Sequence, residues 1–397
     1  MSNQSTLSFG VPQPEQHEEL NRLLTAALHI PAPNMVSWVE GLGQENMRLV
    51  QRDQRVVAGL GLIHMGQWFG GRRVPMAGVT AVGVAPDQRG GGVGSVLMRG
   101  MLEELHGQGV ALSALYPATL SFYRKFDYLR AGYRLTYELP LATIDVDERA
   151  GELVPITPEH YPDLRRLYEE RARQSAGNLH RPEWMWQARL EPKDSPAFRF
   201  LVVNEGRLEG YVVFTQGARS EPLQVADLCA LTPTAGRRLL TLFAGYRTMV
   251  EHVVWSGGTH DPLLYMLGEN MIGGSRAKAR ITRPLEWMLR IVDVEAALNE
   301  RGYPAGLNAE LHLDLHDPLL PGNNGRWVLR VADGRGSVEA GGAGRVELGV
   351  AELAAIYSSF MAPSELRAIG AIRGSDEDLA LMGALFSGPQ PWIGDMF

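Results

Sequence analysis

The sequence contains almost no cysteine and no long apolar run. Cys229 is the single cysteine among 397 residues, so an internal disulfide is excluded. Its largely apolar neighbours, from Ala226 to Leu231, favour a buried and inert thiol over a reactive nucleophile. The longer apolar runs, such as Phe200 to Val203, end far short of the roughly 20 residues that a membrane-spanning helix requires. We therefore expect neither a disulfide-stapled fold nor a membrane partner.

Basic residues are also in short supply. The 38 lysines and arginines are outnumbered by 45 aspartates and glutamates, which gives a formal net charge of -7. A nucleic-acid-binding protein needs a basic face for the phosphates, so this balance argues against a nucleic-acid partner. An acidic protein more readily attracts cationic substrates. The segment from Met1 to Gly10 carries no basic start before an apolar core, so we expect no secretory signal and a cytoplasmic location.

The length predicts more than one domain, and residues 1–150 have the pattern of an α/β sheet. Several short strands precede a long strand, Val74 to Val84, which ends at a proline and a glycine run. An amphipathic helix from Val93 to Gly107 follows directly, because Val96, Leu97, Met101 and Leu105 share one side of it. A strand, a short helix and a last strand complete the first predicted domain.

Residues 151–285 repeat the beginning of this plan. A helix is expected from Pro158 to Gln174, followed by a hairpin within residues 199–215. A strand followed by a helix is expected again, at Val225 to Leu231 and Thr234 to Met249, but no glycine run joins the two. We therefore predict a degenerate copy of the first domain that has no catalytic role.

From residue 286 onward the pattern changes to a compact α+β domain. A helix is expected from Val294 to Arg301, an alternating strand from Glu310 to Leu315, and helices close the domain. His312, Asp314 and His316 lie on one face of that strand and have the chemistry of metal ligands. No fourth ligand is near them in the sequence, so a solvated polar face is favoured and we expect no metal.

The glycine run lies between a strand end and a helix start. Val82-Gly83-Val84-Ala85-Pro86-Asp87-Gln88-Arg89-Gly90-Gly91-Gly92-Val93-Gly94 allows successive backbone N–H groups to converge on an anion at a helix N-terminus. Such a nest suits a pyrophosphate. It is not a Walker loop, because no Lys-Ser/Thr follows Gly94, and the preceding antiparallel strands do not fit a dinucleotide fingerprint. A flexible turn remains the alternative reading.

In this context, Arg89-x-x-Gly92-x-Gly94 resembles the acetyl-CoA signature of the GNAT superfamily of N-acetyltransferases. The resemblance implies acetyl-CoA as the co-substrate, lying where the strand before the loop splays from its neighbour. It also implies that this strand's backbone binds the pantetheine arm and that the loop binds the pyrophosphate. The coenzyme-binding residues assigned in this way are Val82, Gly83, Val84, Arg89, Gly90, Gly91, Gly92, Val93 and Gly94.

A tyrosine downstream supplies a candidate acid. Expulsion of a thiolate from a thioester is eased by a proton donor, and a phenol with a pKa near about 10 stays protonated at neutral pH. The segment from Phe122 to Tyr128 resembles the superfamily's tyrosine-x-x-phenylalanine-glycine-tyrosine pattern, which assigns the acid to Tyr123. Asp127 stands where relatives usually have glycine. Packing of Tyr123, Phe126 and Tyr128 as core aromatics is the alternative.

The chain ends in an unusually apolar segment, from Pro391 to Phe397. An apolar end predicts docking, and a docked terminus delivers an α-carboxylate that is ionised at pH 7. The plan of an acetyltransferase domain, a degenerate copy and a third domain resembles the Eis (enhanced intracellular survival) family over nearly the whole chain. The resemblance implies that the third domain is sterol-carrier-protein-like and that the carboxylate of Phe397 is the general base. An apolar plug is the alternative role for Phe397.

The same resemblance bears on the acceptor and the assembly. Trp38 resembles a substrate-pocket tryptophan that stacks on a cationic amine, although a core position is equally compatible with the sequence. The implied activity is acetylation of a primary amine on an aminoglycoside-like or polyamine-like small molecule, and the implied assembly is a hexamer. A non-catalytic lipid carrier built on the third domain and a protein lysine acetyltransferase are the alternatives.

Overall fold

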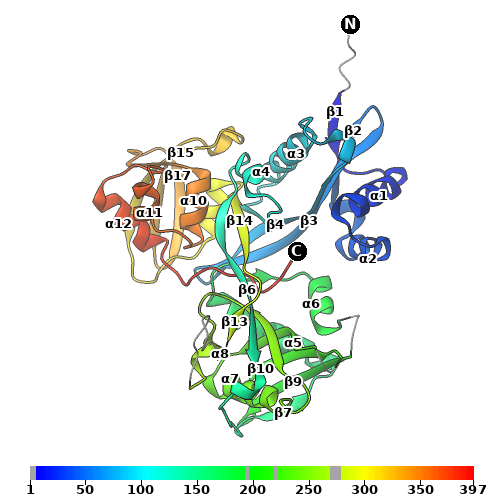
Figure 1. The fold of residues 1–397 in the computed structure, drawn as a ribbon. Helices are drawn as coiled ribbons and strands as arrows, with labels where there is room; N and C mark the ends of the chain where they lie inside the picture. Colours follow the sequence, from blue (N-terminus) through cyan, green and yellow to red (C-terminus); the bar gives the residue numbers. More distant parts are fainter. Residues whose placement is uncertain (1–5, 193–195, 219–220, 269–278) are drawn as a thin grey trace. The chain divides into compact units, whose positions relative to one another are not determined.

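The computed structural model describes residues 6–192, 196–218, 221–268 and 279–397, so the first half of the polar N-terminal segment lies outside the described residues. The chain forms two compact units. The first contains the chain up to residue 131, residues 287–388 and Phe397, and the second contains residues 132–286 and 389–396 (Figure 1). The boundaries expected from the sequence, 1–150, 151–285 and 286–397, remain predictions.

A twisted sheet organises the first unit. Its strands are β1 (Leu7–Gly10), β2 (Met47–Arg52), β3 (Arg55–Phe69), β4 (Arg72–Val84), β5 (Leu112–Leu115) and β14 (Leu285–Ile291), in that spatial order. All neighbours are antiparallel except β4 and β5, which are parallel. Gly70 and Gly71 both have positive φ, as a tight hairpin between β3 and β4 requires.

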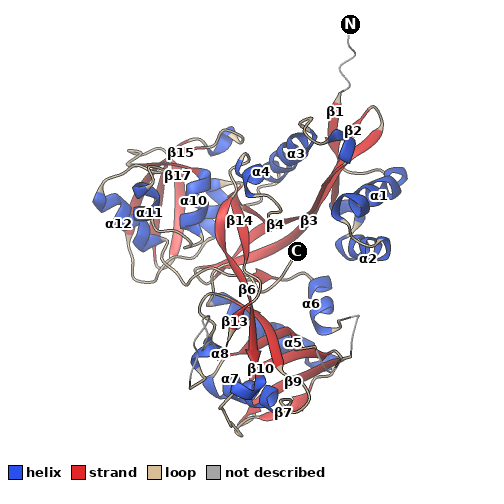
Figure 2. Cartoon of the chain, in the orientation of Figure 1, coloured by secondary structure: helices blue, strands red, loops and turns tan. Residues whose placement is uncertain are grey.

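Helices cover this sheet. They are α1 (His17–Leu28), α2 (Ala32–Leu42), α3 (Val93–Gly107) and α4 (Leu120–Arg124), and Figure 2 shows them against the strands. The helix predicted from Val93 to Gly107 is confirmed as α3, whose apolar side at Leu97, Met101 and Leu105 is fully buried. Gly59 and Gly83 allow the side chains of α1 to lie directly on β3 and β4.

The C-terminal part of the first unit has its own sheet. Strands β15 (Ala309–His316), β16 (Gly325–Ala332), β17 (Arg335–Ala340) and β18 (Val346–Gly349) lie in the order β17-β16-β15-β18. The helices are α9 (Val294–Glu300), α10 (Val350–Tyr357), α11 (Pro363–Ala368) and α12 (Asp376–Leu385). The ion pair of Arg290 with Asp317 is fully buried here. The predicted α+β character is confirmed.

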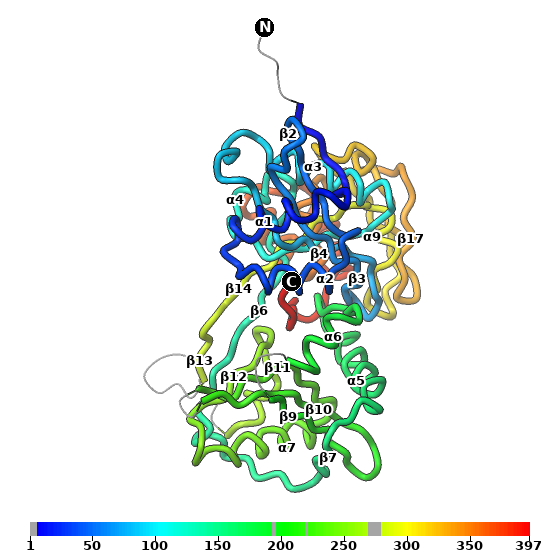
Figure 3. Tube along the Cα trace, turned by 90° about the vertical axis from the view of Figure 1, so that its right-hand side faces the viewer, coloured from blue at the N-terminus to red at the C-terminus, as the bar shows by residue number. Residues whose placement is uncertain are grey.

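The second unit has a similar arrangement of strands and helices (Figure 3, green). Its sheet runs β6 (Leu129–Pro140), β12 (His252–Gly257), β11 (Leu223–Ala230), β10 (Arg207–Gln216), β9 (Ala197–Asn204) and β7 (Glu152–Pro155). The remaining elements are β8 (Leu179–His180), β13 (Arg280–Ile281), α5 (Tyr161–Arg173), α6 (Glu183–Leu190), α7 (Pro233–Ala244) and α8 (Pro262–Tyr265). As in the first unit, one neighbouring pair, β11 and β12, is parallel.

Some elements differ from the sequence prediction. Helix α2 begins with Pro31 at its N-cap and carries Pro33 in its first turn, where a missing N–H costs no hydrogen bond. Strand β14 was not predicted from the sequence; it pairs with β5, and Leu289 lies opposite Ala114. No helix in the described part of the chain combines the length and apolarity needed to span a bilayer.

Candidate functional site

The glycine run forms a nest of backbone N–H groups at the start of α3. Gly90 and Gly92 have φ of 78° and 79°, a left-handed conformation that residues with a side chain rarely adopt. Gly91 instead donates its N–H to the carbonyl of Gln88. A Cβ on Gly90 or Gly92 would meet open space, so these glycines are required by backbone conformation and not by packing.

The donors of this nest have no hydrogen-bond partner in the described part of the chain. Among the described residues, no acceptor is present for the N–H groups of Gly90, Gly92, Val93 and Gly94. The first N–H groups of a helix have no intrahelical acceptor, and the positive end of the helix dipole lies there. The arrangement is therefore suited to an anion with several acceptor oxygens, such as a pyrophosphate.

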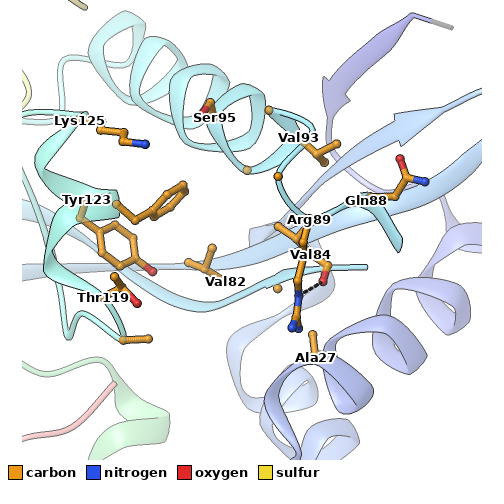
Figure 4. A pocket seen from close by; sticks show the side chains of 16 residues that line it. Ala27, Val82, Val84, Gln88, Arg89, Val93, Ser95, Thr119, Tyr123 and Lys125 are labelled. Atoms are coloured by element: carbon orange, nitrogen blue, oxygen red, sulfur yellow. Dashed lines mark hydrogen bonds between the residues drawn. The ribbon is translucent and has the colours of Figure 1, made fainter. Parts of the chain in front are cut away.

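A cavity of about 580 Å³ opens beside this nest (Figure 4). It brings together strand β4, the loop, the start of α3 and helix α4. Its lining residues are Ala27, Val82, Gly83, Val84, Gln88, Arg89, Gly90, Gly92, Val93, Gly94, Ser95, Ala118, Thr119, Phe122, Tyr123 and Lys125. All the predicted coenzyme residues except Gly91 are among them.

The cavity exists because β4 and β5 separate. They pair only over Met76–Gly78, and beyond that point β4 has no strand neighbour on this side among the described residues, although Arg89 Nε donates to the carbonyl of Val84 at 3.4 Å. Ala81 has φ of 51°, and the register between β3 and β4 slips at the same place, which marks a β-bulge. The backbone of Val82 to Val84 is consequently an open edge able to form strand-like hydrogen bonds with an extended ligand.

Tyr123 projects from α4 into the same cavity. Its side chain is 7% exposed and contacts the rings of Phe122 and Tyr128, at centroid distances of 5.1 and 6.2 Å. The hydroxyl points toward Val82 (Figure 4). Burial raises the pKa of Tyr123 to about 12, so the phenol is protonated throughout the neutral range.

Asp127 forms a tight turn between α4 and Tyr128. Its φ is 58°, in the left-handed region that aspartate tolerates better than most residues. The N–H of Tyr128 donates to the carbonyl of Tyr123 across this turn. The departure at Asp127 therefore leaves Tyr128 in place, and its hydroxyl lies 2.6 Å from that of Ser113.

Trp38 lies outside the cavity lining but close to the same sheet. It is half-buried on α2, and a Cβ on Gly61 of β3 would come within 2.7 Å of its ring edge. The methyl group of Thr80 borders the same point. Trp38 therefore lies over the strands at a position two residues before Val82 on β4.

The terminal residue is docked on the first unit's sheet. A Cβ on Gly78 would be 2.9 and 3.0 Å from two ring carbons of Phe397. The ring also makes an edge contact with Tyr116, at a centroid distance of 5.4 Å and an angle of 61°. Gly78 precedes Val82 by four residues on β4, a chain distance of at most about 14 Å.

The second unit repeats the strand separation without the nest. Beyond Leu223 and Gln224, β11 no longer pairs with β12. The carbonyls of Ala226 and Leu228 on the open edge accept hydrogen bonds from the side chains of Arg189 and Arg171. No glycine run precedes α7, so this copy has neither a free strand edge nor an anion nest.

Other groups singled out in the sequence have structural partners. Cys229 is fully buried, burial raises the pKa of its thiol to about 11, and its Sγ lies 3.4 Å from the carbonyl of Leu167. His312 is hydrogen-bonded to Glu310 and to the N–H of Ala343. In the described ranges, no group of three or more metal-ligating side chains comes together.

Three polar lining residues were not singled out from the sequence: Ser95, Thr119 and Lys125. Ser95 follows the loop, and its proximity to the helix start is a sequence signal for a phosphate contact. Thr119 and Lys125 bracket α4. These two residues could not be identified from the sequence, because only the tertiary structure shows that both ends of α4 lie at the cavity.

Three stretches of the chain match known domain families. Residues 11–131 and 177–291 each match an acetyltransferase (GNAT) domain, and residues 294–394 match the sterol carrier protein domain. The predicted fold of two such acetyltransferase domains and a sterol-carrier-like domain is confirmed.

Similar proteins cover most or all of the chain. A GCN5-related N-acetyltransferase from Anabaena variabilis is 34% identical, with a TM-score of 0.93, over 99% of this chain and 100% of that one. Another, from Kribbella flavida, is 29% identical with a TM-score of 0.88 over 99% of both chains. The N-acetyltransferase Eis of Mycobacterium tuberculosis is 27% identical over 325 residues, which are 77% of this chain and 76% of that protein.

Proposed function

Because this chain belongs to the GCN5-related N-acetyltransferases and is an Eis-like member of them, we propose that it acetylates a primary amine of a cationic small molecule. Acetyl transfer and the use of acetyl-CoA follow from the family. The acceptor, the catalytic residues and their order of action are the proposed part.

One observation carries the proposal: the unpartnered N–H groups of the loop and the open edge of β4 line one cavity with the hydroxyl of Tyr123. The nest at Gly90 to Gly94 binds the pyrophosphate, and the backbone of Val82 and Val84 binds the pantetheine arm. In this proposed binding mode the thioester sulfur lies near the phenol of Tyr123, whose pKa burial raises to about 12. Acetyl-CoA supplies the activated acyl group when it is bound there.

In the proposed mechanism, the chain moves two protons. The carboxylate of Phe397 accepts a proton from the acceptor ammonium through a water, and the free amine attacks the thioester carbonyl. A C–N bond forms, the C–S bond breaks, and Tyr123 donates its proton to the departing thiolate. The acylated nitrogen then loses its second proton, which restores the phenol of Tyr123, and the protonated terminal carboxyl group of Phe397 releases its proton to solvent. The products are the N-acetylated amine and CoA thiol. Trp38 contributes a π-face for the cationic acceptor.

A thiol-release assay across an amine panel tests the proposal. Acetyl-CoA is incubated with the protein and polyamines, aminoglycosides or amino-acid amides, and free CoA thiol is measured. We expect release that depends on a cationic amine. If no amine in the panel raises the rate above spontaneous hydrolysis, the catalytic proposal fails.

A second candidate, a lipid carrier based on the sterol-carrier-like domain, rests on that domain match alone. Calorimetry separates it from the enzyme: acetyl-CoA binding favours the enzyme, whereas fatty-acid or sterol binding without acetyl-CoA binding favours the carrier. A peptide lysine included in the amine panel tests the protein acetyltransferase alternative.

The hexamer and the cytoplasmic location are further proposals from family resemblance, and light scattering on the purified protein tests the hexamer.

A further inference from the structure

The second unit contains a cavity of about 360 Å³ that plays no part in the proposed acetyl transfer. It lies where β11 and β12 separate, the position within this unit that corresponds to the coenzyme cavity of the first. Its walls come from these strands, the region of α8, the side chain of Arg171 on α5 and the tail residue Trp392. Its volume is in the range of small-molecule sites.

This cavity is unsuited to a nucleotide. Thr232 caps α7 by accepting the N–H of Ala235, and no glycine nest is present. The sulfur of Met266 would lie 2.6 Å from a Cβ on Gly236, so Met266 fills the space beside α7. The wall is otherwise largely apolar and includes Val225, Leu228, Trp255, Leu263, Met266 and Trp392. A ligand with an apolar body fits such a wall.

Arg171 gives the cavity a positive charge. Its Nη1 donates to the carbonyl of Leu228, and its Nε is buried and has no hydrogen-bond partner among the described residues. The guanidinium lies 5.5 Å from the ring centroid of Trp392 and 5.3 Å from that of Tyr168. Within the described part of the chain, no carboxylate forms an ion pair with Arg171.

The neighbouring carboxylates are already paired with other arginines. Asp227 accepts two hydrogen bonds from Arg181, at 2.6 and 3.1 Å. Asp395 accepts from the Nε atoms of Arg181 and Arg189, at 3.0 and 3.1 Å. Of the three guanidinium groups beside these two carboxylates, Arg171 is the one that forms no direct ion pair among the described residues.

Asp261 is the remaining acid in the cavity wall. Its oxygens accept hydrogen bonds from Trp255 Nε1, at 2.8 Å, and from the N–H of Leu263, at 2.9 Å. Both oxygens of Asp261 are therefore engaged by these two donors, and neither forms a direct ion pair with Arg171 among the described residues. His260 is exposed and also lines the cavity.

We propose that this cavity is a binding site for a small aromatic monocarboxylate. The carboxylate lies against the guanidinium of Arg171 and gives it a direct ionic partner, and the aromatic body lies against Trp392 and the apolar wall. The site is separate from the coenzyme cavity, and binding requires no acetyl transfer.

The test uses 4-fluorobenzoate as the probe and 4-fluorobenzamide as its neutral match, each observed by fluorine NMR with the full chain. We expect 4-fluorobenzoate to bind with a dissociation constant below about 1 mM and the amide to bind at least about tenfold more weakly. Saturating CoA should leave probe binding unchanged. Equal binding of both probes, displacement by CoA, or no binding at all overturns the proposal.

Two Arg171 variants and one control variant locate the site. Arg171→Gln should weaken 4-fluorobenzoate binding at least about tenfold. The control is Arg166→Gln, on the same helix in an exposed pair with Asp163, which should leave the binding unchanged. Arg171→Lys keeps the charge but loses the planar fork, and we expect a smaller loss of affinity. Arg171→Lys is the fallback variant if Arg171→Gln does not fold, as judged by the absence of a cooperative unfolding transition. Unchanged affinity in a folded Arg171 variant places the probe elsewhere and overturns the proposal.

Discussion

The ring of Phe397 lies directly on Gly78, in a space that any side chain at position 78 would occupy. A Cβ there would approach two ring carbons to 2.9 and 3.0 Å, and the end of Met65 to 2.4 Å. Met65 is flexible at this end, whereas the ring of Phe397 is also in contact with Tyr116. The absence of a side chain at Gly78 therefore allows the ring of Phe397 to pack directly on β4.

Gly78→Ala should displace Phe397 and lower kcat by about 10- to 100-fold, because a base misplaced by about an ångström loses its geometry. The dissociation constant for acetyl-CoA, measured by calorimetry, should change little. Gly10→Ala is the matched strand control, since a Cβ there meets nothing within 4 Å. A Gly78 variant with normal kcat would leave Phe397 as an apolar plug.

Tyr123→Phe removes only the phenolic hydroxyl. We expect kcat to fall about 100-fold with little change in coenzyme affinity, since general acid catalysis contributes on that scale. Retention of the normal rate would exclude Tyr123 as the acid.

The pH profile offers an independent check on Tyr123. Burial raises its pKa to about 12, above the ordinary value of 10.0, so the acid form is present at every pH well below 12. We therefore expect no alkaline decline in kcat caused by Tyr123 up to about pH 10. A decline with a midpoint near pH 8 or 9 that disappears in Tyr123→Phe would contradict this assignment.

The glycines of the loop should differ in their sensitivity to substitution. Gly90→Ala and Gly92→Ala force a side chain into left-handed backbone at φ of 78° and 79°, which costs about 1 to 2 kcal/mol each. We expect acetyl-CoA affinity to fall about tenfold because the nest distorts. Gly91→Ala is the control, since its φ is not positive and the nearest atom to its Cβ is at 3.4 Å. Equal losses at all three positions would argue against a conformational role.

Asp395→Asn should destabilise the second unit. Asp395 is fully buried and pairs with Arg181 and Arg189. Loss of its charge leaves Arg181 paired with Asp227 alone and removes the carboxylate that pairs with Arg189. We expect the free energy of unfolding to fall by about 3 kcal/mol in urea titrations. Asp163→Asn, in an exposed pair with Arg166, should change it by less than about 1 kcal/mol. A similarly small effect at Asp395 would contradict the proposed anchoring.

Local patterns predicted the parts of the fold that local physics determines. Helix α3 was predictable because its apolar residues recur at helical spacing between two glycine signals. The pairing of Leu289 with Ala114 was not, because no local feature of either segment identifies a partner so far along the chain. The loop at Gly90 to Gly94 was identified as an anion nest, whereas the contact of Phe397 with Gly78 needed tertiary structure.

The contrast between the open edges of β4 and β11 has a thermodynamic consequence. The second unit completes its own edge, because Arg171 and Arg189 satisfy the carbonyls of Leu228 and Ala226. In the first unit the carbonyl of Val84 accepts a hydrogen bond from Arg89 Nε, at 3.4 Å, and in the proposed binding mode the rest of the stretch at Val82 to Val84 pairs with the coenzyme. Ligand that binds only the native state adds a stability of RT ln(1 + [L]/Kd), so the two units should respond unequally to coenzyme. We expect saturating CoA to raise the melting temperature of the first unit. The second unit should respond less, because arginine side chains of its own already occupy the carbonyls of its strand edge.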